Sequence, residues 1–330
     1  MEPREALTEI ATLLERERAS RYRSQAFRAA AAAIEGLTSE ELADTAALRR
    51  RKGIGDSSLA VIQEALAGGV PRYLAELRCS AEAAVSTLRP RLRGDLHAHS
   101  EWSDGLTSID LMVDAARALG HEYLALTDHS PRLRVARGLS PERLREQLRL
   151  VPSFSVDEFT LLSGIEVDIL DDGALDQEEG LLAELGVVVA SAHSKLRMES
   201  AAMTRRLVAA VSSPHVDVLG HVTGRLVSGS RGTRPPSTFD PVAVFAACAS
   251  HGVAVEINSR PEREDPPDEL IAVALSEGCL FSIDSDAHAP GQLALLSEGA
   301  VRAERAGVPP ERIVTTWPLE QLREWTARHA

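Results

Sequence analysis

The chain has 330 residues, 44% hydrophobic and 26% charged, which leaves room for one large α/β domain and a smaller one. Its net charge of −13 argues against unspecific nucleic-acid binding, although residues 1–93 carry 15 Lys and Arg against 13 Asp and Glu. No apolar run reaches membrane-spanning length and residues 1–17 lack the apolar core of a signal peptide, so we expect a cytoplasmic protein.

Residues 1–78 have the pattern of a small helical domain. Leu7, Ile10, Leu13 and Leu14 recur at helical spacing, and an alanine-rich helix follows Tyr22. Further on, Gly53-Ile54-Gly55 predicts a tight hairpin between two helices, preceded by Arg51 and Lys52. Such a turn exposes backbone N–H groups at a helix N-terminus, where a phosphate can bind. The alternative is a plain connector between two helices.

Residues 79–93 are predicted to be a linker, and from residue 94 short apolar runs alternate with amphipathic stretches. We expect strands near residues 95–96, 123–126, 160–165, 187–190, 216–219, 253–257 and 280–283. Helices are expected at 111–119, 203–211, 241–250 and 268–277. This alternation is typical of an α/β fold with a parallel sheet or barrel, and we assign residues 94–330 to it.

Ligand-type side chains follow these strands at their carboxyl ends, the face on which β/α barrels build active sites. They are His97, His99, Asp104, His129, Glu166, His193, His221, Asp286 and His288. A lone histidine in such a place is more often structural, but nine residues in register are hard to explain that way. His121, His215, His251 and His329 lack the position, and we expect them to lie in loops or on the surface.

Mixed imidazole and carboxylate ligands favour Zn²⁺, Mn²⁺ or Fe²⁺, and nine ligands imply two or three ions. Glu166 and Asp286 are the natural bridges, and with His288 they form the expected catalytic centre. Closely spaced ions would activate a bridging hydroxide for attack at phosphorus, so that no serine or cysteine nucleophile is needed.

The strand-end motifs resemble the PHP (polymerase and histidinol phosphatase) family over roughly residues 93–315. The motifs are Asp95-Leu96-His97-Ala98-His99-Ser100, Thr127-Asp128-His129-Ser130, Gly164-Ile165-Glu166-Val167-Asp168, Ser191-Ala192-His193-Ser194, Leu219-Gly220-His221 and Ser285-Asp286-Ala287-His288. The resemblance implies a distorted seven-stranded β/α barrel with a trinuclear metal centre, and the nine residues as its ligands.

The branch attached to bacterial family X DNA polymerases is the most similar, on Gly220–Arg225 and Val255–Pro261. Those polymerases also open with a small helix–hairpin–helix domain, which residues 1–78 resemble, but no polymerase palm is present here. Ser57 and Val61 stand where lyase-active relatives carry lysines, so Schiff-base lyase chemistry is not expected. Arg51-Lys52 replaces the usual apolar-proline pair.

Four further side chains are candidate substrate ligands. Lys195, Arg225 and Arg260 could hold phosphate oxygens, with surface salt bridging as the alternative. Asn258 could orient the substrate or serve as a structural amide. Asp128 is a candidate for orienting an imidazole.

The sequence therefore predicts a metal-dependent phosphoester hydrolase that acts on nucleic-acid ends or nucleotides, such as a 3′–5′ exonuclease or 3′-phosphatase. A small-molecule phosphatase, for a histidinol-phosphate-like or nucleotide-bisphosphate substrate, is the first alternative. A DNA-binding accessory module with a structural metal site is the second. We expect no obligate protein partner.

Overall fold

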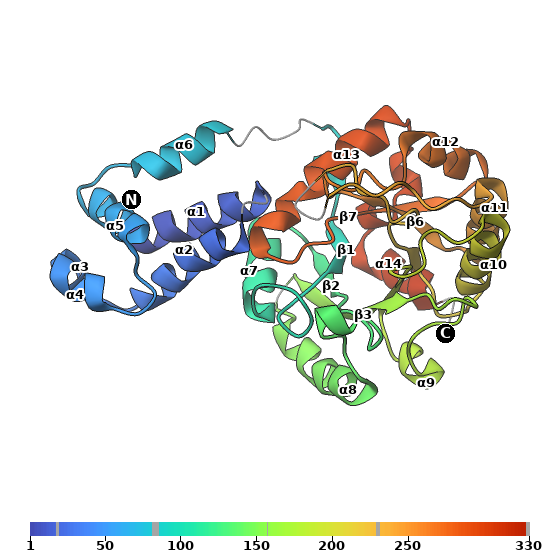
Figure 1. The fold of residues 1–330 in the computed structure, drawn as a ribbon, viewed down its shortest axis with the longest axis horizontal. Helices are drawn as coiled ribbons and strands as arrows, with labels where there is room; N and C mark the ends of the chain where they lie inside the picture. The colour runs from blue at the N-terminus through green and yellow to red at the C-terminus, as the bar shows by residue number, and fades with distance from the viewer. Residues whose placement is uncertain (18–19, 81–85, 157, 229–231, 328–330) are drawn as a thin grey trace. The chain divides into compact units, whose positions relative to one another are not determined.

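The computed structural model describes residues 1–17, 20–80, 86–156, 158–228 and 232–327 (Figure 1). Its contacts divide the chain into two compact units. The helical unit comprises Met1–Ala83 with Pro290–Gln292, and the barrel unit comprises Ala84–Ala289 with Leu293–Ala330. The break at residues 83 and 84 falls inside the segment for which we predict a linker, of which residues 81–85 lie outside the described residues.

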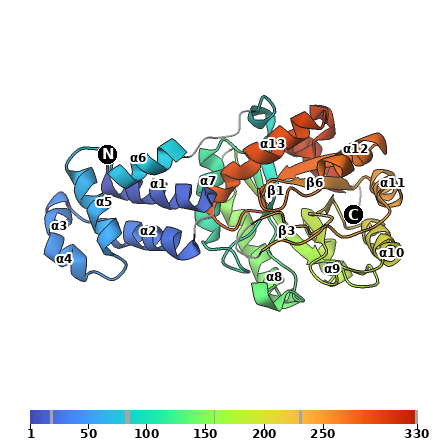
Figure 2. The ribbon, with the colours of Figure 1, turned by 45° about the horizontal axis from the view of Figure 1, so that its top comes forward.

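The helical unit packs its helices around one apolar core (Figure 2). Its helices are α1 (Pro3–Arg16), α2 (Arg21–Ala33), α3 (Ser39–Ala43), α4 (Thr45–Arg50), α5 (Asp56–Leu66) and α6 (Arg72–Ser80). Leu7, Ile10 and Leu14 form the buried stripe of α1, as their spacing predicts, and join a core that includes Phe27 and Ile62. This core belongs to the helical unit alone, so the unit has its own source of hydrophobic stabilisation.

The predicted hairpin lies between α4 and α5. Gly53 has a φ of +95°, a left-handed conformation that costs other residues free energy. Gly55 then caps α5, where its N–H donates to the Ser58 hydroxyl at 3.0 Å. A Cβ added to Gly53 would lie 3.1 Å from the Ala29 carbonyl oxygen, so the turn passes close to α2.

Seven parallel strands in the described part of the chain form a nearly closed barrel in sequence order (Figure 1). They are β1 (Gly94–Ala98), β2 (Tyr123–Leu126), β3 (Thr160–Asp168), β4 (Val187–Ser191), β5 (Val218–Leu219), β6 (Ala254–Asn258) and β7 (Leu280–Asp284). Between β1 and β7 the Leu96 N–H donates to the Asp284 carboxylate at 2.8 Å, and Ala98 pairs with Ala287 beyond the strand. The expected α/β barrel with a helical region is thus confirmed.

Helices surround the strands. The α-helices are α7 (Ile109–Ala118), α8 (Pro141–Leu150), α9 (Glu179–Leu182), α10 (Ser200–Val211), α11 (Pro241–His251), α12 (Asp268–Ser276), α13 (Leu296–Arg305) and α14 (Leu319–Thr326). Short 3₁₀ turns are η1 (Arg89–Arg91), η2 (Arg134–Ala136), η3 (Val151–Phe154), η4 (Pro290–Leu295), η5 (Pro310–Arg312) and η6 (Val314–Thr316). None of the helices in the described ranges is long and apolar enough to cross a bilayer.

The amino end of the barrel is plugged by apolar side chains. Leu322 and Trp325 of α14 join the cluster that contains the inward-facing Leu96 and Val189. The Trp325 indole N–H donates to the Gly252 carbonyl oxygen at 2.9 Å, which fixes the plug. The carboxyl ends of the strands are therefore the end at which polar groups can gather.

Candidate metal centre

The nine predicted ligand residues converge at the carboxyl end of the barrel. His97 lies in β1 and Glu166 in β3. The other seven lie in the loops that follow the strands: His99, Asp104, His129, His193, His221, Asp286 and His288. The parallel order of the strands brings these loops to one edge. Most of the nine side chains are buried, and Asp104, with 36% of its side chain exposed, is the most open.

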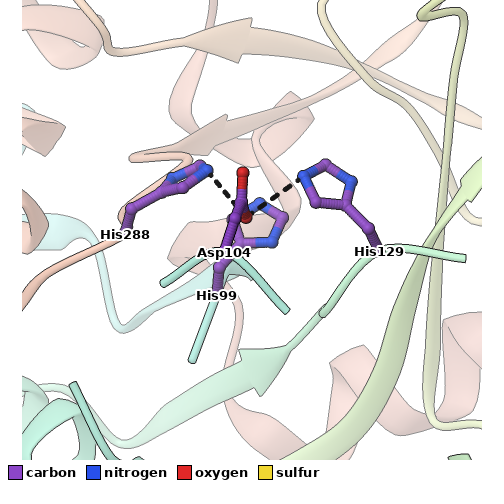
Figure 3. A group of neighbouring side chains, drawn as sticks. All are labelled: His99, Asp104, His129 and His288. Atoms are coloured by element: carbon purple, nitrogen blue, oxygen red, sulfur yellow. Dashed lines mark ion pairs between the residues drawn. The ribbon is translucent and has the colours of Figure 1, made fainter. Parts of the chain in front are cut away.

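One group of possible ligands contains His99, Asp104, His129 and His288 (Figure 3). Asp104 Oδ1 lies 3.5 Å from His129 Nε2 and 3.3 Å from His288 Nε2. The His99 ring is close to both of these rings, with centroids 4.5 Å from that of His129 and 4.3 Å from that of His288. One ion could take all four side chains.

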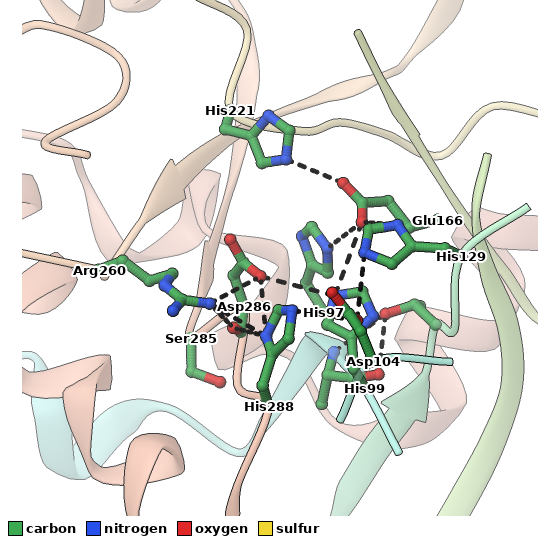
Figure 4. Close-up of polar contacts among 12 residues, drawn as sticks. His97, His99, Asp104, His129, Glu166, His221, Arg260, Ser285, Asp286 and His288 are labelled. Carbon is green, nitrogen blue, oxygen red and sulfur yellow. Dashed lines mark hydrogen bonds and ion pairs between the residues drawn. The ribbon is translucent and has the colours of Figure 1, made fainter. Parts of the chain in front are cut away.

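Glu166 lies among four of the ligand histidines (Figure 4 shows three of them). One carboxylate oxygen lies 2.8 Å from His221 Nε2 and 3.3 Å from His193 Nε2. The other lies 3.3 Å from His97 Nε2 and 2.8 Å from His129 Nδ1. A carboxylate with imidazoles on both oxygens has the arrangement expected of a bridge between two ions.

The unpaired ring nitrogens fit bound metal ions. Within the described ranges, His97 Nε2, both ring nitrogens of His99 and Nδ1 of His221 are buried without a hydrogen-bond partner. A buried polar atom left without a partner costs free energy, so such atoms are rare in folded proteins. Imidazole nitrogens and carboxylate oxygens are ordinary ligands of Zn²⁺ and similar ions, which would satisfy them.

The electrostatics of the centre keep its carboxylates ionised. Burial alone would raise the pKa of Glu166, but the neighbouring imidazoles of His129, His193 and His97 hold it well below its usual value. Burial would likewise raise the pKa of Asp286, and the Arg260 and Arg263 guanidinium groups hold it well below.

Two of the histidines have pKa values that are shifted in opposite directions. Burial and the nearby His288 and His129 lower the pKa of His99 to about 3, so His99 is neutral. Burial would also lower the pKa of His193, but Glu166 and Asp168 outweigh it and raise the pKa to about 9. His193 therefore holds a proton that a metal ion must displace.

Two buried residues of the centre were not predicted from the sequence. Glu256 of β6 accepts a hydrogen bond from His97 Nδ1 at 2.6 Å and another from the His221 backbone N–H at 2.5 Å. Arg263 donates from Nε to the Asp286 carboxylate at 3.1 Å. Alternation along β6 was a usable signal for Glu256, since it shares a strand face with Asn258 two residues later. Arg263 lies in a loop, where periodicity gives no signal.

The four candidate substrate ligands have different surroundings. Arg260 lies at the centre, with Nη1 2.9 Å from the Asp286 carbonyl oxygen and 3.0 Å from His288 Nδ1. The Asn258 amide donates to Asp286 at 3.2 Å. Arg225 donates instead to the Arg263 carbonyl oxygen at 3.0 Å, and the exposed Lys195 pairs with Asp171.

One expectation about another residue differs from the structure. Within the described residues Asp128 has no imidazole partner: it accepts hydrogen bonds from Ser100, Ser103 and Gln147, and so holds the loop after β1. His121 lies in a loop, as expected, but its side chain is buried, and burial lowers its pKa to about 3. His329 lies outside the described residues.

A β/α barrel with clustered imidazoles and carboxylates at its carboxyl end has the arrangement of a metal-dependent enzyme. The PHP domain model matches residues 95–260, half of the chain, and a helix-hairpin-helix domain model matches residues 2–71. The chain belongs to the PHP family of metal-dependent phosphoesterases, as its strand-end motifs predict.

Known relatives are of two kinds. The "DNA polymerase/3'-5' exonuclease PolX" of Bacillus subtilis is 34% identical over 72% of this chain, a match that covers 42% of that longer protein. The "Probable phosphatase YcdX" of Escherichia coli is 27% identical over 69% of this chain and 91% of its own length. Among solved structures, Lactococcus lactis histidinol phosphate phosphatase, complexed with zinc, L-histidinol and phosphate, gives a TM-score of 0.44 at 19% identity, over 66% of this chain and 94% of that one.

Proposed function

We propose that this chain hydrolyses phosphoesters at nucleic-acid ends or in nucleotides, as a 3′–5′ exonuclease or 3′-phosphatase, with two or three Zn²⁺, Mn²⁺ or Fe²⁺ ions. The observation that carries the proposal is the position of Glu166, whose two carboxylate oxygens each face imidazole nitrogens. Glu166 belongs to two of three overlapping groups of ligand atoms.

Seven of the nine residues belong to at least one of these groups, which supports the proposal. One is His97, His99 and Glu166, the second is His129, Glu166 and His193, and the third is His99, Asp104, His129 and His288. His221 and Asp286 lie beside them, His221 Nε2 at 2.8 Å from Glu166 and Asp286 Oδ1 at 3.5 Å from His99 Nε2. When bound, the ions would acidify a water molecule and neutralise the charge that develops on a phosphoryl group.

Protein side chains would orient the substrate phosphate. Arg260 and Arg263 place two guanidinium groups beside Asp286, and a guanidinium fork suits phosphate oxygens. Asn258 holds Asp286 from the β6 side. Lys195 and Arg225 remain candidates at the rim, where each would have to exchange its present partner for a phosphate oxygen.

The match to a helix-hairpin-helix domain and the similarity to a protein named as a 3′–5′ exonuclease support a nucleic-acid substrate. In the hairpin, Arg51, Lys52 and Gly53 are exposed ahead of the α5 N-terminus. Together with Gly55 they form a basic, exposed turn ahead of a helix N-terminus, which suits a phosphodiester backbone without base recognition.

A small-molecule phosphatase is the second candidate. Two relatives named as probable phosphatases match 67% and 69% of this chain over 89% and 91% of their own length. A substrate such as histidinol phosphate or a nucleotide bisphosphate would need the barrel alone.

A substrate panel tests the proposal. The full chain, supplemented with Mn²⁺ or Zn²⁺, would be assayed on single-stranded and gapped DNA, RNA, 3′-phosphate ends, nucleotide bisphosphates and histidinol phosphate. The same panel would be run with R51Q/K52Q and with R72Q, a matched loss of an exposed arginine on α6. We expect polymer substrates to be preferred, and only the hairpin variant to lose that preference. Preference for a small phosphate, unchanged in R51Q/K52Q, would favour the second candidate.

A further inference from the structure

The side chains of the metal centre differ in their exposure to solvent. Among its nine residues, Asp104, His288 and His193 have side chains that are 36%, 19% and 15% exposed, whereas the side chain of His129 is 6% exposed. The other five are buried more deeply. A substrate therefore approaches across the loops that carry these three residues, and Asp104 marks the most open part of the mouth.

Beside this mouth, residues 131–139 form a compact turn after His129. The Leu139 N–H donates to the His129 carbonyl oxygen at 2.7 Å, so the turn returns to the ligand from which it starts. A Cβ added to Gly138 would lie 1.8 Å from the Ser130 carbonyl oxygen. Arg137 adopts a left-handed φ of +56°, an unfavourable conformation for arginine.

Two arginine side chains fasten the turn to the loop that carries Asp104 (Figure 3 shows Asp104 and His129). Arg137 donates to the Ser103 carbonyl oxygen at 2.9 Å and to that of Glu101 at 2.8 Å. Arg143 donates to the Arg137 carbonyl oxygen at 2.7 Å and also to that of Trp102. The turn is thus held in one place relative to Asp104, despite its backbone strain.

The tip of the turn presents cationic and apolar groups to solvent. Val135 is 91% exposed, and Arg132 and Arg134 flank it as exposed residues. Within the described chain the Arg134 side chain has no hydrogen-bond or ion-pair partner. Residues 130–150 contain six arginines against two glutamates, although the chain as a whole has a net charge of −13.

Neighbouring acidic residues do not neutralise the positive charge of this tip. Asp171 forms an ion pair with Lys195, which together with nearby Arg132 lowers the pKa of its carboxyl group. Asp176 accepts a hydrogen bond from the Arg132 backbone N–H. Arg134 is left as a cation that is free for a ligand, next to an exposed apolar side chain.

We propose that the tip formed by Arg132, Arg134 and Val135 is a contact for a polynucleotide strand whose end occupies the metal centre. The arginines would bind phosphates next to the scissile one, and Val135 would pack against a sugar or base. This proposal rests on the nucleic-acid function proposed above and adds that the barrel itself selects a polymer over a single nucleotide. Rigid fastening serves this role because a fixed contact keeps the scissile phosphate in register.

The test compares a long and a small substrate on the full-length protein with Mn²⁺. We would measure kcat/KM for a single-stranded octanucleotide and for bis(p-nitrophenyl) phosphate with the wild type, R134A/V135S and R134K. The control is R323Q, because Arg323 is exposed on α14 beside Thr160 and Gly186, at the amino ends of β3 and β4.

We expect the ratio of octanucleotide to small-substrate kcat/KM to fall about tenfold in R134A/V135S, since a phosphate contact and an apolar contact are both removed. R134K should retain most of the ratio, and the salt dependence of octanucleotide turnover should weaken in R134A/V135S. An unchanged ratio in R323Q would show that the effect is specific to arginines beside the mouth of the metal centre.

Two failures can be told apart. Suppose that the wild type cleaves the octanucleotide. If the ratio of kcat/KM values is then unchanged in R134A/V135S, or falls equally in R323Q, the tip proposal is wrong and the proposed function stands. If the wild type cleaves bis(p-nitrophenyl) phosphate but no nucleic acid or nucleotide, the proposed function fails, and the tip proposal fails with it.

Discussion

A histidine that is to bind a metal ion through one ring nitrogen needs a partner for the other, which fixes the ring and its tautomer. Glu256 supplies this partner for His97, at 2.6 Å from Nδ1, and turns Nε2 toward Glu166. Its second oxygen accepts the backbone N–H of His221, a residue held at the unusual φ of +20°. One buried carboxylate thus positions two histidines on the two oxygens of Glu166.

Replacing Glu256 with glutamine should weaken metal binding selectively. The amide keeps the size of the side chain but has only one acceptor oxygen for three N–H donors, those of His97, His221 and the Asn258 amide. We expect Zn²⁺ affinity around Glu166 to fall about 10- to 100-fold, with little effect on the group of Asp104, His129 and His288. Equilibrium dialysis with metal analysis would measure this as a loss of part of the bound zinc. Full stoichiometry at wild-type affinity would contradict the role of Glu256.

Metal uptake should depend on pH through His193. In the metal-free protein its pKa is raised to about 9, so its proton stabilises the fold fully below pH 6.5, and this contribution is lost as the pH rises through 9. A bound metal ion needs the neutral imidazole, so Zn²⁺ affinity should rise with pH toward 9. Calorimetry in two buffers of different ionisation enthalpy would count the protons released near pH 7.5. H193N should release about one proton fewer, and equal release by both proteins would contradict the assignment.

The residues of the site were predictable to the extent that they end strands. His193 and His221 each follow an apolar run, and parallel strands bring such positions together whatever the details of packing. Arg263 could not be found, because its place depends on how the loop after β6 folds back over Asp286. Asp128 has the right position in sequence, but its side chain points to hydroxyl groups of the β1 loop instead.

At the scale of elements, type and order followed from the sequence, whereas strand length did not. The strand that we expected to end at Ile165 continues to Asp168, because it pairs with β2 at its start and with β4 at its end. In β5 only Val218 and Leu219 pair regularly, since the Asp217 carboxylate takes the Val188 N–H. Such lengths depend on neighbouring strands, which periodicity along one segment cannot report.

The hairpin offers a test of an element. Gly53→Ala should destabilise the helical unit by about 1–2 kcal/mol, because alanine is strained at a left-handed φ, and its Cβ would lie 3.1 Å from the Ala29 carbonyl oxygen. Gly55→Ala is the matched control, since Gly55 has a φ of −106° and no atom within 4 Å of an added Cβ. Urea unfolding followed by far-ultraviolet circular dichroism would compare them. Equal stability of the two variants would argue against the strained turn.

At the scale of the whole molecule, the two units have separate cores and different optical probes. Apolar side chains of α1, α2 and α5 make up the helical core, whereas the barrel has its own clusters around β1 to β7. Trp102, Trp317 and Trp325 all belong to the barrel unit, and residues 1–83 contain no tryptophan. Tryptophan fluorescence therefore reports unfolding of the barrel specifically.

Removal of metal should lower the stability of the barrel unit. Without bound ions, several ring nitrogens around Glu166 are buried without a hydrogen-bond partner, among them those of His99, and this costs free energy of folding. An ion that binds only the folded state stabilises it by about 4 kcal/mol at a free concentration 1,000 times its dissociation constant. We expect EDTA to lower the fluorescence midpoint of thermal unfolding in the wild type. His99→Asn removes an imidazole shared by two of the ligand groups. Its midpoint of thermal unfolding should be lower than that of the wild type, and EDTA should lower it by less. A wild-type midpoint insensitive to EDTA and to added Zn²⁺ would show that the fold does not depend on these ions, and would leave the buried imidazoles to be satisfied by water.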